Sequence, residues 1–179
     1  MARIRISGGQ WRSRLIEVTD APGLRPTPDR VRQTLFNWLG QDLTGMACLD
    51  LFAGSGLLGF EAASRGASRV TLVERDALAF AALRRSAEEL GAGQTELRRA
   101  DALEFLASIS GQTGYDLIFI DPPYHQGWLA RVEPYLAAAA NEQALLYVEA
   151  EHEVHSLGDW HCVKRGKAGQ VHYHLLEQP

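Results

Sequence analysis

From residue 47 onward, short apolar runs alternate with longer segments in which apolar residues recur every three or four positions. The short runs are typical of buried strands, and the longer segments are typical of helices. The predicted strands are 47–51, 69–74, 95–98, 115–120 and 144–149, and the predicted helices between them are 56–65, 77–90, 102–108 and 129–139. This alternation predicts an α/β fold with a mostly parallel sheet covered by helices on both faces.

The first residues follow a different pattern. Residues 3–7 and 15–18 alternate around Gly8-Gly9, which predicts a small β-hairpin with arginines on its exposed face. Further on, Thr27-Pro28-Asp29 offers an N-cap, a proline at the first helical position and an early acid. We therefore expect a helix from this point to about Gly40.

The last residues favour antiparallel pairing. Residues 160–164 and 171–176 are strand-like, and a hairpin through 166–169 joins them better than a helical crossover would. Together with the five strands above, this hairpin predicts a sheet of seven strands. The expected organisation is a β-hairpin extension over residues 1–24 and one main domain over residues 25–179.

Composition supports a single globular domain with a small extension. The chain has 179 residues, of which 46% are hydrophobic and 22% are charged. No apolar stretch approaches the roughly 18 residues that a membrane-spanning helix needs, and the start lacks the apolar core of a signal peptide. We expect a cytoplasmic monomer that does not associate with membranes.

Charge is distributed unevenly along the chain. The formal net charge is −4, but residues 1–32 carry seven arginines against three acids, and the remainder is strongly acidic. A basic end on an acidic body would suit a module that docks on phosphates while the body holds a small cofactor. The alternative is a solvated surface hairpin.

A glycine-rich turn follows the first strand of the predicted sheet. Gly54, Gly56 and Gly59 match the G-x-G-x-x-G pattern of dinucleotide-binding proteins, and Glu74 lies near the position of the expected ribose-binding acid. Glycines at such a turn let the backbone approach a ligand, and the next helix offers unpaired N–H groups. A nicotinamide-binding module is one interpretation, although little chain is left for a substrate domain.

Acidic residues at three strand ends favour S-adenosylmethionine, which has a ribose, an adenine and a cationic amino-acid arm but no phosphate. Glu74 could accept from both ribose hydroxyls, Asp101 from the adenine amino group, and Asp50 could face the ammonium group. Alternatively, Asp50 and Asp101 could simply cap the following helices. The predicted cofactor-binding residues are Asp50, Phe52, Gly54, Gly56, Glu74, Arg75, Asp101 and Ala102.

The segment Asp121-Pro122-Pro123-Tyr124 follows an apolar strand, at the end where α/β sheets bind ligands. Proline removes an N–H donor and leaves a carbonyl that can only accept. The Asp121 carboxylate and the Pro122 carbonyl could hold both hydrogens of a nucleobase amino group, or of a glutamine amide. Tyr124 could stack on the ring, and Asp121 could take the released proton. A rigid loop without chemistry is the alternative to these four catalytic residues.

Topology predicts that cofactor and target meet. In a doubly wound sheet the first and fourth strands are neighbours, so Asp50 and Asp121 should flank one crevice. A paired base cannot enter such a crevice, so the target should be unpaired or flipped. We predict no metal site, because the histidines near the end of the chain lack acids or cysteines at ligand spacing.

With these motifs in place, the chain resembles the RsmD family of bacterial 16S ribosomal RNA guanine-N2 methyltransferases over nearly its whole length. The resemblance rests on segments 6–12, 23–39, 49–56 and 121–124, of which the first two are the more selective. It implies a Rossmann-like class I methyltransferase fold and methyl transfer from S-adenosylmethionine to one guanine, nucleotide 966 in the family's 16S rRNA. The implied substrate is rRNA within a 30S subunit or an assembly intermediate.

The resemblance also bears on the basic N-terminus. The residues expected to contact RNA are Arg3, Arg5, Arg12, Arg30 and Arg32. The family often has phenylalanine in place of Tyr124, which preserves stacking. Besides the nicotinamide module, two rival functions remain, a DNA adenine-N6 methyltransferase with the same tetrapeptide and a non-catalytic RNA-binding protein. The short chain leaves no room for the target-recognition domain of the former.

Overall fold

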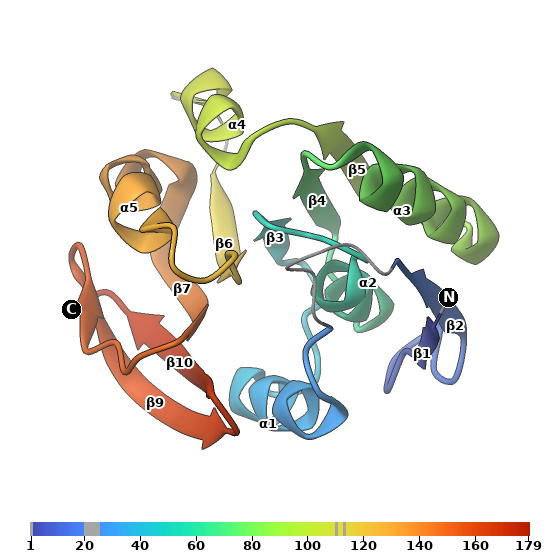
Figure 1. Cartoon of the computed structure of the whole chain (residues 1–179), viewed down its shortest axis with the longest axis horizontal. Coiled ribbons are helices and arrows are strands. Elements are labelled where there is room, and N and C mark those ends of the chain that lie inside the picture. The colour runs from blue at the N-terminus through green and yellow to red at the C-terminus, as the bar shows by residue number, and fades with distance from the viewer. Residues whose placement is uncertain (1, 20–25, 110, 113) are drawn as a thin grey trace.

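The computed structural model describes residues 2–19, 26–109, 111–112 and 114–179. Its main sheet has eight strands in the order β5-β4-β3-β6-β7-β10-β9-β8 (Figure 1). The parallel strands are β3 (Ala47–Asp50), β4 (Arg69–Glu74), β5 (Thr95–Arg99), β6 (Tyr115–Ile120) and β7 (Ala140–Ala150). The antiparallel strands are β8 (Ser156–Leu157), β9 (Trp160–Ala168) and β10 (Val171–Glu177).

Helices cover both faces of this sheet, as the sequence predicted (Figure 1). One face carries α1 (Asp29–Leu39), α2 (Leu57–Ser64) and α3 (Ala77–Leu90), whose Phe36, Phe60 and Leu83 share one hydrophobic cluster. The other face carries α4 (Ala102–Ser108) and α5 (Trp128–Ala139), whose Phe105 and Leu136 belong to a second cluster. The α/β class and the C-terminal hairpin are therefore confirmed. None of these described helices combines the length and apolar character needed to cross a bilayer.

The prediction of seven strands was wrong by one. The additional strand, β8, pairs through only Ser156 and Leu157 with the edge of β9, and two residues are too few to show a periodic pattern. The hairpin turn also lies later than predicted, at Gly169-Gln170. Gly166 is within β9, where a Cβ would lie 2.3 Å from the Tyr173 ring, and Gly169 makes the turn with φ of +59°.

The N-terminal hairpin consists of β1 (Ala2–Arg5) and β2 (Leu15–Val18) and packs beside α3. The prediction of a hairpin turn at Gly8-Gly9 was wrong, because residues 6–14 form a longer connection that folds onto α2. A Cβ at Gly9 would lie 2.0 Å from the Ser64 carbonyl oxygen, so this glycine permits a close approach to α2. The predicted boundary between residues 24 and 25 lies outside the described residues.

Helix α1 begins one residue later than the cap prediction requires. Pro28 occupies the N-cap position and makes no side-chain cap, so the prediction that Thr27 caps the helix was wrong. The Thr27 hydroxyl instead donates to Glu149 Oε1 at 3.0 Å, across to the end of β7. The C-terminal end agrees with expectation, because Gly40 ends α1 in the left-handed conformation.

Candidate active site

A cleft of about 1010 Å³ lies at the carboxyl edge of the sheet. β3 pairs in parallel with β6, so the predicted adjacency of the first and fourth strands is confirmed. Of the predicted cofactor and catalytic residues, those that line the cleft are Asp50, Phe52, Gly54, Glu74, Arg75, Asp101, Ala102, Asp121, Pro122, Pro123 and Tyr124. The fold therefore brings residues from between positions 50 and 124 of the chain together into one site.

Gly56 is the predicted cofactor residue that does not line the cleft. Its φ is +84°, and a Cβ there would lie 2.4 Å from Leu83 Cδ1 on α3. Gly59, the third glycine of the pattern, faces the sheet, where a Cβ would lie 2.5 Å from Leu72 Cδ2. Both glycines thus serve close packing of α2, whereas Gly54 lines the cleft.

Glu74 ends β4 and is buried, with both carboxylate oxygens held in place. Oε1 accepts from the Gly54 N–H at 2.9 Å, and Oε2 accepts from the Asp76 N–H at 2.7 Å. Each oxygen has a second lone pair for a ligand hydroxyl. The carboxylate is therefore oriented before any ligand arrives, and the glycine turn is tied to it.

Asp101 caps the following helix, as the alternative interpretation of the sequence allowed, and it also lines the cleft. Its Oδ1 accepts from the Leu103 N–H at 2.8 Å and caps α4. Its Oδ2 lies 3.9 Å from Arg75 Nη1 at the cleft wall. One oxygen thus caps the helix, and the other remains on the side of the cleft.

Asp50 is buried at the end of β3 and accepts from the Gly59 N–H at 3.0 Å. Burial raises its pKa to about 7, and the acidic neighbours Glu74 and Glu149 add to the shift. A carboxyl group in this state gains ionisation when a cation enters the cleft. The structure therefore offers a site for a positively charged ligand group.

Asp121 follows β6, and Glu149 is the penultimate residue of the neighbouring strand β7. The pairing of Ile120 with Val148 sets these two acids side by side. Burial and the adjacent Glu149 raise the pKa of Asp121 well above its ordinary value. Glu149 is 4% exposed and was not predicted as a site residue, although an acid at the end of a buried strand is the signal that identified Asp50.

An aromatic pair forms part of the cleft wall. Phe52 meets Trp128 edge to face, with ring centroids 5.2 Å apart, and the Arg131 guanidinium lies 3.9 Å from the centroid of the Trp128 ring. Trp128 is buried and belongs to the second hydrophobic cluster, so it is a core residue that also borders the cleft.

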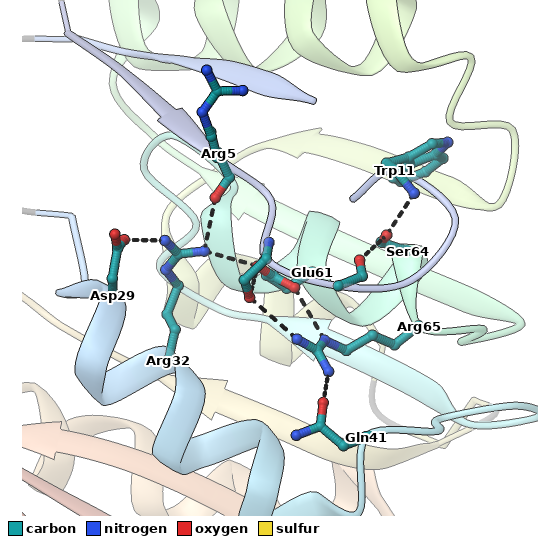
Figure 2. Close-up of polar contacts among 10 residues, drawn as sticks. Arg5, Trp11, Asp29, Arg32, Gln41, Glu61, Ser64 and Arg65 are labelled. Carbon is teal, nitrogen blue, oxygen red and sulfur yellow. Dashed lines mark hydrogen bonds and ion pairs between the residues drawn. The ribbon is translucent and has the colours of Figure 1, made fainter. Parts of the chain in front are cut away.

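A buried ionic network fixes the N-terminal connection to the main domain (Figure 2). At its centre is Glu61 of α2, which accepts from Ser7, from Arg32 Nη1 at 2.8 Å and from Arg65 Nε at 3.1 Å. Nearby, Ser64 accepts from the Trp11 N–H at 2.9 Å. Segment 6–12, one of the more selective motifs of the family resemblance, therefore packs against α2.

Arg32 is therefore a correction to the predicted RNA contacts. Its side chain is 1% exposed and is paired with Glu61 and Asp29, so it has no surface to offer to RNA. The other predicted arginines, Arg3, Arg5, Arg12 and Arg30, are exposed.

The electrostatics of the cleft separate the candidate ligands. The acids that line it are Asp50, Glu74, Asp76, Asp101, Asp121, Glu149 and Glu151. Among the described lining residues, Arg75 is the only arginine or lysine. Such a lining suits a cationic ligand without phosphate and opposes a pyrophosphate, which disfavours the nicotinamide interpretation. No group of three or more potential metal ligands occurs among the described residues.

Comparison with known proteins agrees with this geometry. The model of the protein family "Conserved hypothetical protein 95" matches residues 4–177. Ribosomal RNA small subunit methyltransferase D of Escherichia coli K12 is 42% identical over 182 residues, covering 98% of this chain and 90% of that protein. The chain belongs to the ribosomal RNA small subunit methyltransferase D family. The resemblance drawn from the sequence motifs is thereby confirmed.

Two solved structures extend the comparison to the fold of this family. The putative methyltransferase yhhF from Escherichia coli is 42% identical, with a TM-score of 0.87 over 99% of this chain and 98% of that chain. An RNA methyltransferase from Salinibacter ruber, in complex with S-adenosyl-L-homocysteine, is 21% identical, with a TM-score of 0.67 over 87% of this chain and 94% of that chain. The latter likeness shows a shared methyltransferase fold.

Proposed function

We propose that this protein transfers a methyl group from S-adenosylmethionine to the exocyclic N2 amino group of one guanine in small-subunit 16S rRNA. The observation that carries the proposal is the meeting of the acid-lined cleft with Asp121-Pro122-Pro123-Tyr124 at one edge of the sheet. Family membership supports the substrate class. A guanine at the family's position, nucleotide 966, is the expected target.

The residues that line the cleft fit S-adenosylmethionine and do not fit a ligand that carries phosphate groups. When bound, S-adenosylmethionine supplies an electrophilic methyl group on a positively charged sulfur. Glu74 would accept from the ribose hydroxyls, Asp50 would face the ammonium group, and Asp101 Oδ2 would accept from the adenine amino group. Phe52, Gly54, Arg75 and Ala102 would form the surrounding walls.

Asp121 and Pro122 would hold the target nitrogen. Accepting both amino hydrogens, they would favour a pyramidal N2 whose lone pair points at the methyl group. As the new N–C bond forms and the S–C bond breaks, Asp121 would take the proton that N2 loses. Burial and the adjacent Glu149 raise the pKa of Asp121, which strengthens it as a proton acceptor.

The exposed arginines would meet the rRNA backbone. Arg3 and Arg5 lie on the hairpin, Arg12 follows in the docked connection, and Arg30 lies in the first turn of α1. Val18, Thr19 and Pro26 line the cleft, so the same segment borders both the arginines and the site. Phosphates held there would bring a flipped base to Asp121.

Variants of the tetrapeptide test this proposal. We expect Asp121→Asn to slow single-turnover methylation of small subunits, taken from cells that lack the enzyme, by about 100-fold or more. Tyr124→Phe should retain most activity because the ring still stacks, whereas Tyr124→Ala should lose roughly 10-fold or more. Asp116→Asn is the matched control, since Asp116 lies on β6 but bonds Ala47 and Asn141 away from the cleft. A wild-type rate in Asp121→Asn would contradict the assignment.

A further inference from the structure

Glu149 has an orientation that its neighbours impose. Its Oε1 accepts from the Thr27 hydroxyl at 3.0 Å and from the Tyr147 hydroxyl at 2.6 Å. Burial and the nearby Glu149 raise the pKa of Tyr147 well above its ordinary value, so the phenol stays a donor. With Oε1 occupied twice, the second oxygen, Oε2, is the one left for Asp121 or for a ligand.

This carboxylate has no counter-ion among the described residues of the protein. Within the described parts of the chain, none of the ion pairs involves Glu149, although its side chain is 4% exposed and lines the cleft. A buried carboxylate without a counter-ion is costly unless hydrogen bonds satisfy it. The hydroxyls of Thr27 and Tyr147 supply two such hydrogen bonds.

The two acids form a pair of acceptors at the place where the target base would lie. Guanine presents a row of donors on its Watson–Crick edge, the N1–H and the N2 amino group. Adenine presents an acceptor at N1 beside its amino group. Two carboxylates on adjacent strands match a row of donors and leave an adenine N1 without a partner.

We propose that Glu149 is a specificity residue that accepts the N1–H of the target guanine while Asp121 receives the N2 amino group. This inference rests on the proposed function and deepens it. Oε2 accepts the N1–H when the base enters, and Thr27 and Tyr147 keep Oε1 in place throughout. The segment that leads into α1 thereby contributes to base selection through Thr27.

A base analogue separates this role from a structural one. 2-Aminopurine keeps the amino group but has an acceptor at N1 in place of the N1–H, so it can be placed at the target position by ligation into 16S rRNA and reconstituted into small subunits. We expect wild-type protein to favour guanine over 2-aminopurine by roughly 100-fold in kcat/KM. Glu149→Gln should lower this preference by about 10-fold or more, because the amide N–H2 can donate to N1.

Two further variants control for folding and for general loosening of the site. Tyr115→Phe removes a buried phenol hydroxyl that donates to Thr71 at 2.8 Å and does not line the cleft, so it should leave the base preference within about threefold of wild type. If Glu149→Gln does not fold, Glu149→Met, which neither accepts nor donates, should also lower the preference. Affinity for S-adenosylmethionine, measured by thermal shift, should stay unchanged in each folded variant.

The outcomes distinguish this inference from the function beneath it. If wild-type protein methylates guanine N2 and the folded Glu149 variant keeps the wild-type base preference, the role of Glu149 is overturned and the function stands. A base preference that narrows equally in Tyr115→Phe also overturns it. If wild-type protein places no methyl group on guanine N2, the proposed function itself fails.

Discussion

The carboxyl group of Asp50 is buried at the end of β3, and its pKa rises to about 7 from an ordinary value of 3.8. The folded state therefore holds a proton on Asp50 that the unfolded chain has already released. Stability from this group is fully present below pH 3.8 and is lost as the pH rises through about 7. The site thus sacrifices stability at neutral pH in order to keep a carboxylate ready for a cation.

The variant Asp50→Asn tests whether ionisation of Asp50 lowers the stability of the protein as the pH rises. The variant keeps an oxygen for the Gly59 N–H but cannot ionise, so we expect it to be more stable than wild type at pH 8 by about 1–3 kcal/mol. The gain should shrink as the pH falls toward 4, and thermal melts across this range measure it. Asp42 is the opposite case, because Thr44 lowers the pKa of its exposed carboxyl, so Asp42→Asn should lower the melting temperature at pH 8. A gain from Asp50→Asn that does not vary with pH would refute this account.

At the scale of the elements, α2 is the part that joins the N-terminal hairpin to the main domain. Its Glu61 is fully buried and compensates two arginines, Arg32 from α1 and Arg65 from its own last turn (Figure 2). Ser7 donates to the same carboxylate from the hairpin connection. Three elements therefore depend on one acidic side chain for their relative positions.

Glu61→Gln should destabilise the protein by about 3–5 kcal/mol, because the buried Arg65 loses its counter-charge and the buried Arg32 keeps only the exposed Asp29. Chemical denaturation measures the free energy of unfolding. Glu96→Gln is the matched control, since Glu96 pairs with Arg98 in an exposed bridge on β5, and it should cost less than about 1 kcal/mol. Equal losses in the free energy of unfolding would show that the buried network around Glu61 stabilises the protein no more than an exposed salt bridge does.

The sequence predicted elements whose signals are local. Apolar runs placed the strands of the parallel sheet, and the acids after β3 and β6 indicated both halves of the cleft. The connection 6–14 could not be read in this way, because its shape depends on Ser64 and Glu61 of a helix more than fifty residues later. Arg32 was misassigned for the same reason, since only the fold reveals its buried partner.

Glu149 and Thr27 show a second limit of sequence patterns. Glu149 is an acid near the carboxyl end of an apolar strand, which is the same signal that predicts a site residue at Asp50. Thr27 fitted a helix cap, and the competing acceptor at Glu149 lies 122 residues away in the sequence. The Thr27 hydroxyl donates to this buried carboxylate and does not cap the helix, because a buried carboxylate needs hydrogen-bond donors.

At the scale of the whole molecule, both ends of the chain border the cleft. Thr19, Pro26 and Thr27 line it from the N-terminal side, and the β9–β10 turn lines it through Gly169 and Gln170. The hairpin with its arginines lies beside α2 and α3 (Figure 1). RNA phosphates bound to these arginines would lie next to a cleft that is lined with acids. The arginines would attract the RNA backbone to the rim, and the acids would repel its phosphates, so that only the flipped base enters the cleft.

The identity of the methylated nucleoside tests this account most directly. Purified protein and S-adenosylmethionine with a labelled methyl group are incubated with small subunits from cells that lack the enzyme, and the rRNA is digested and analysed by mass spectrometry. We predict a single labelled product, N2-methylguanosine, at one position of 16S rRNA. Label on the N6 of an adenine, or no label in rRNA while the protein is folded and binds the cofactor, would contradict it.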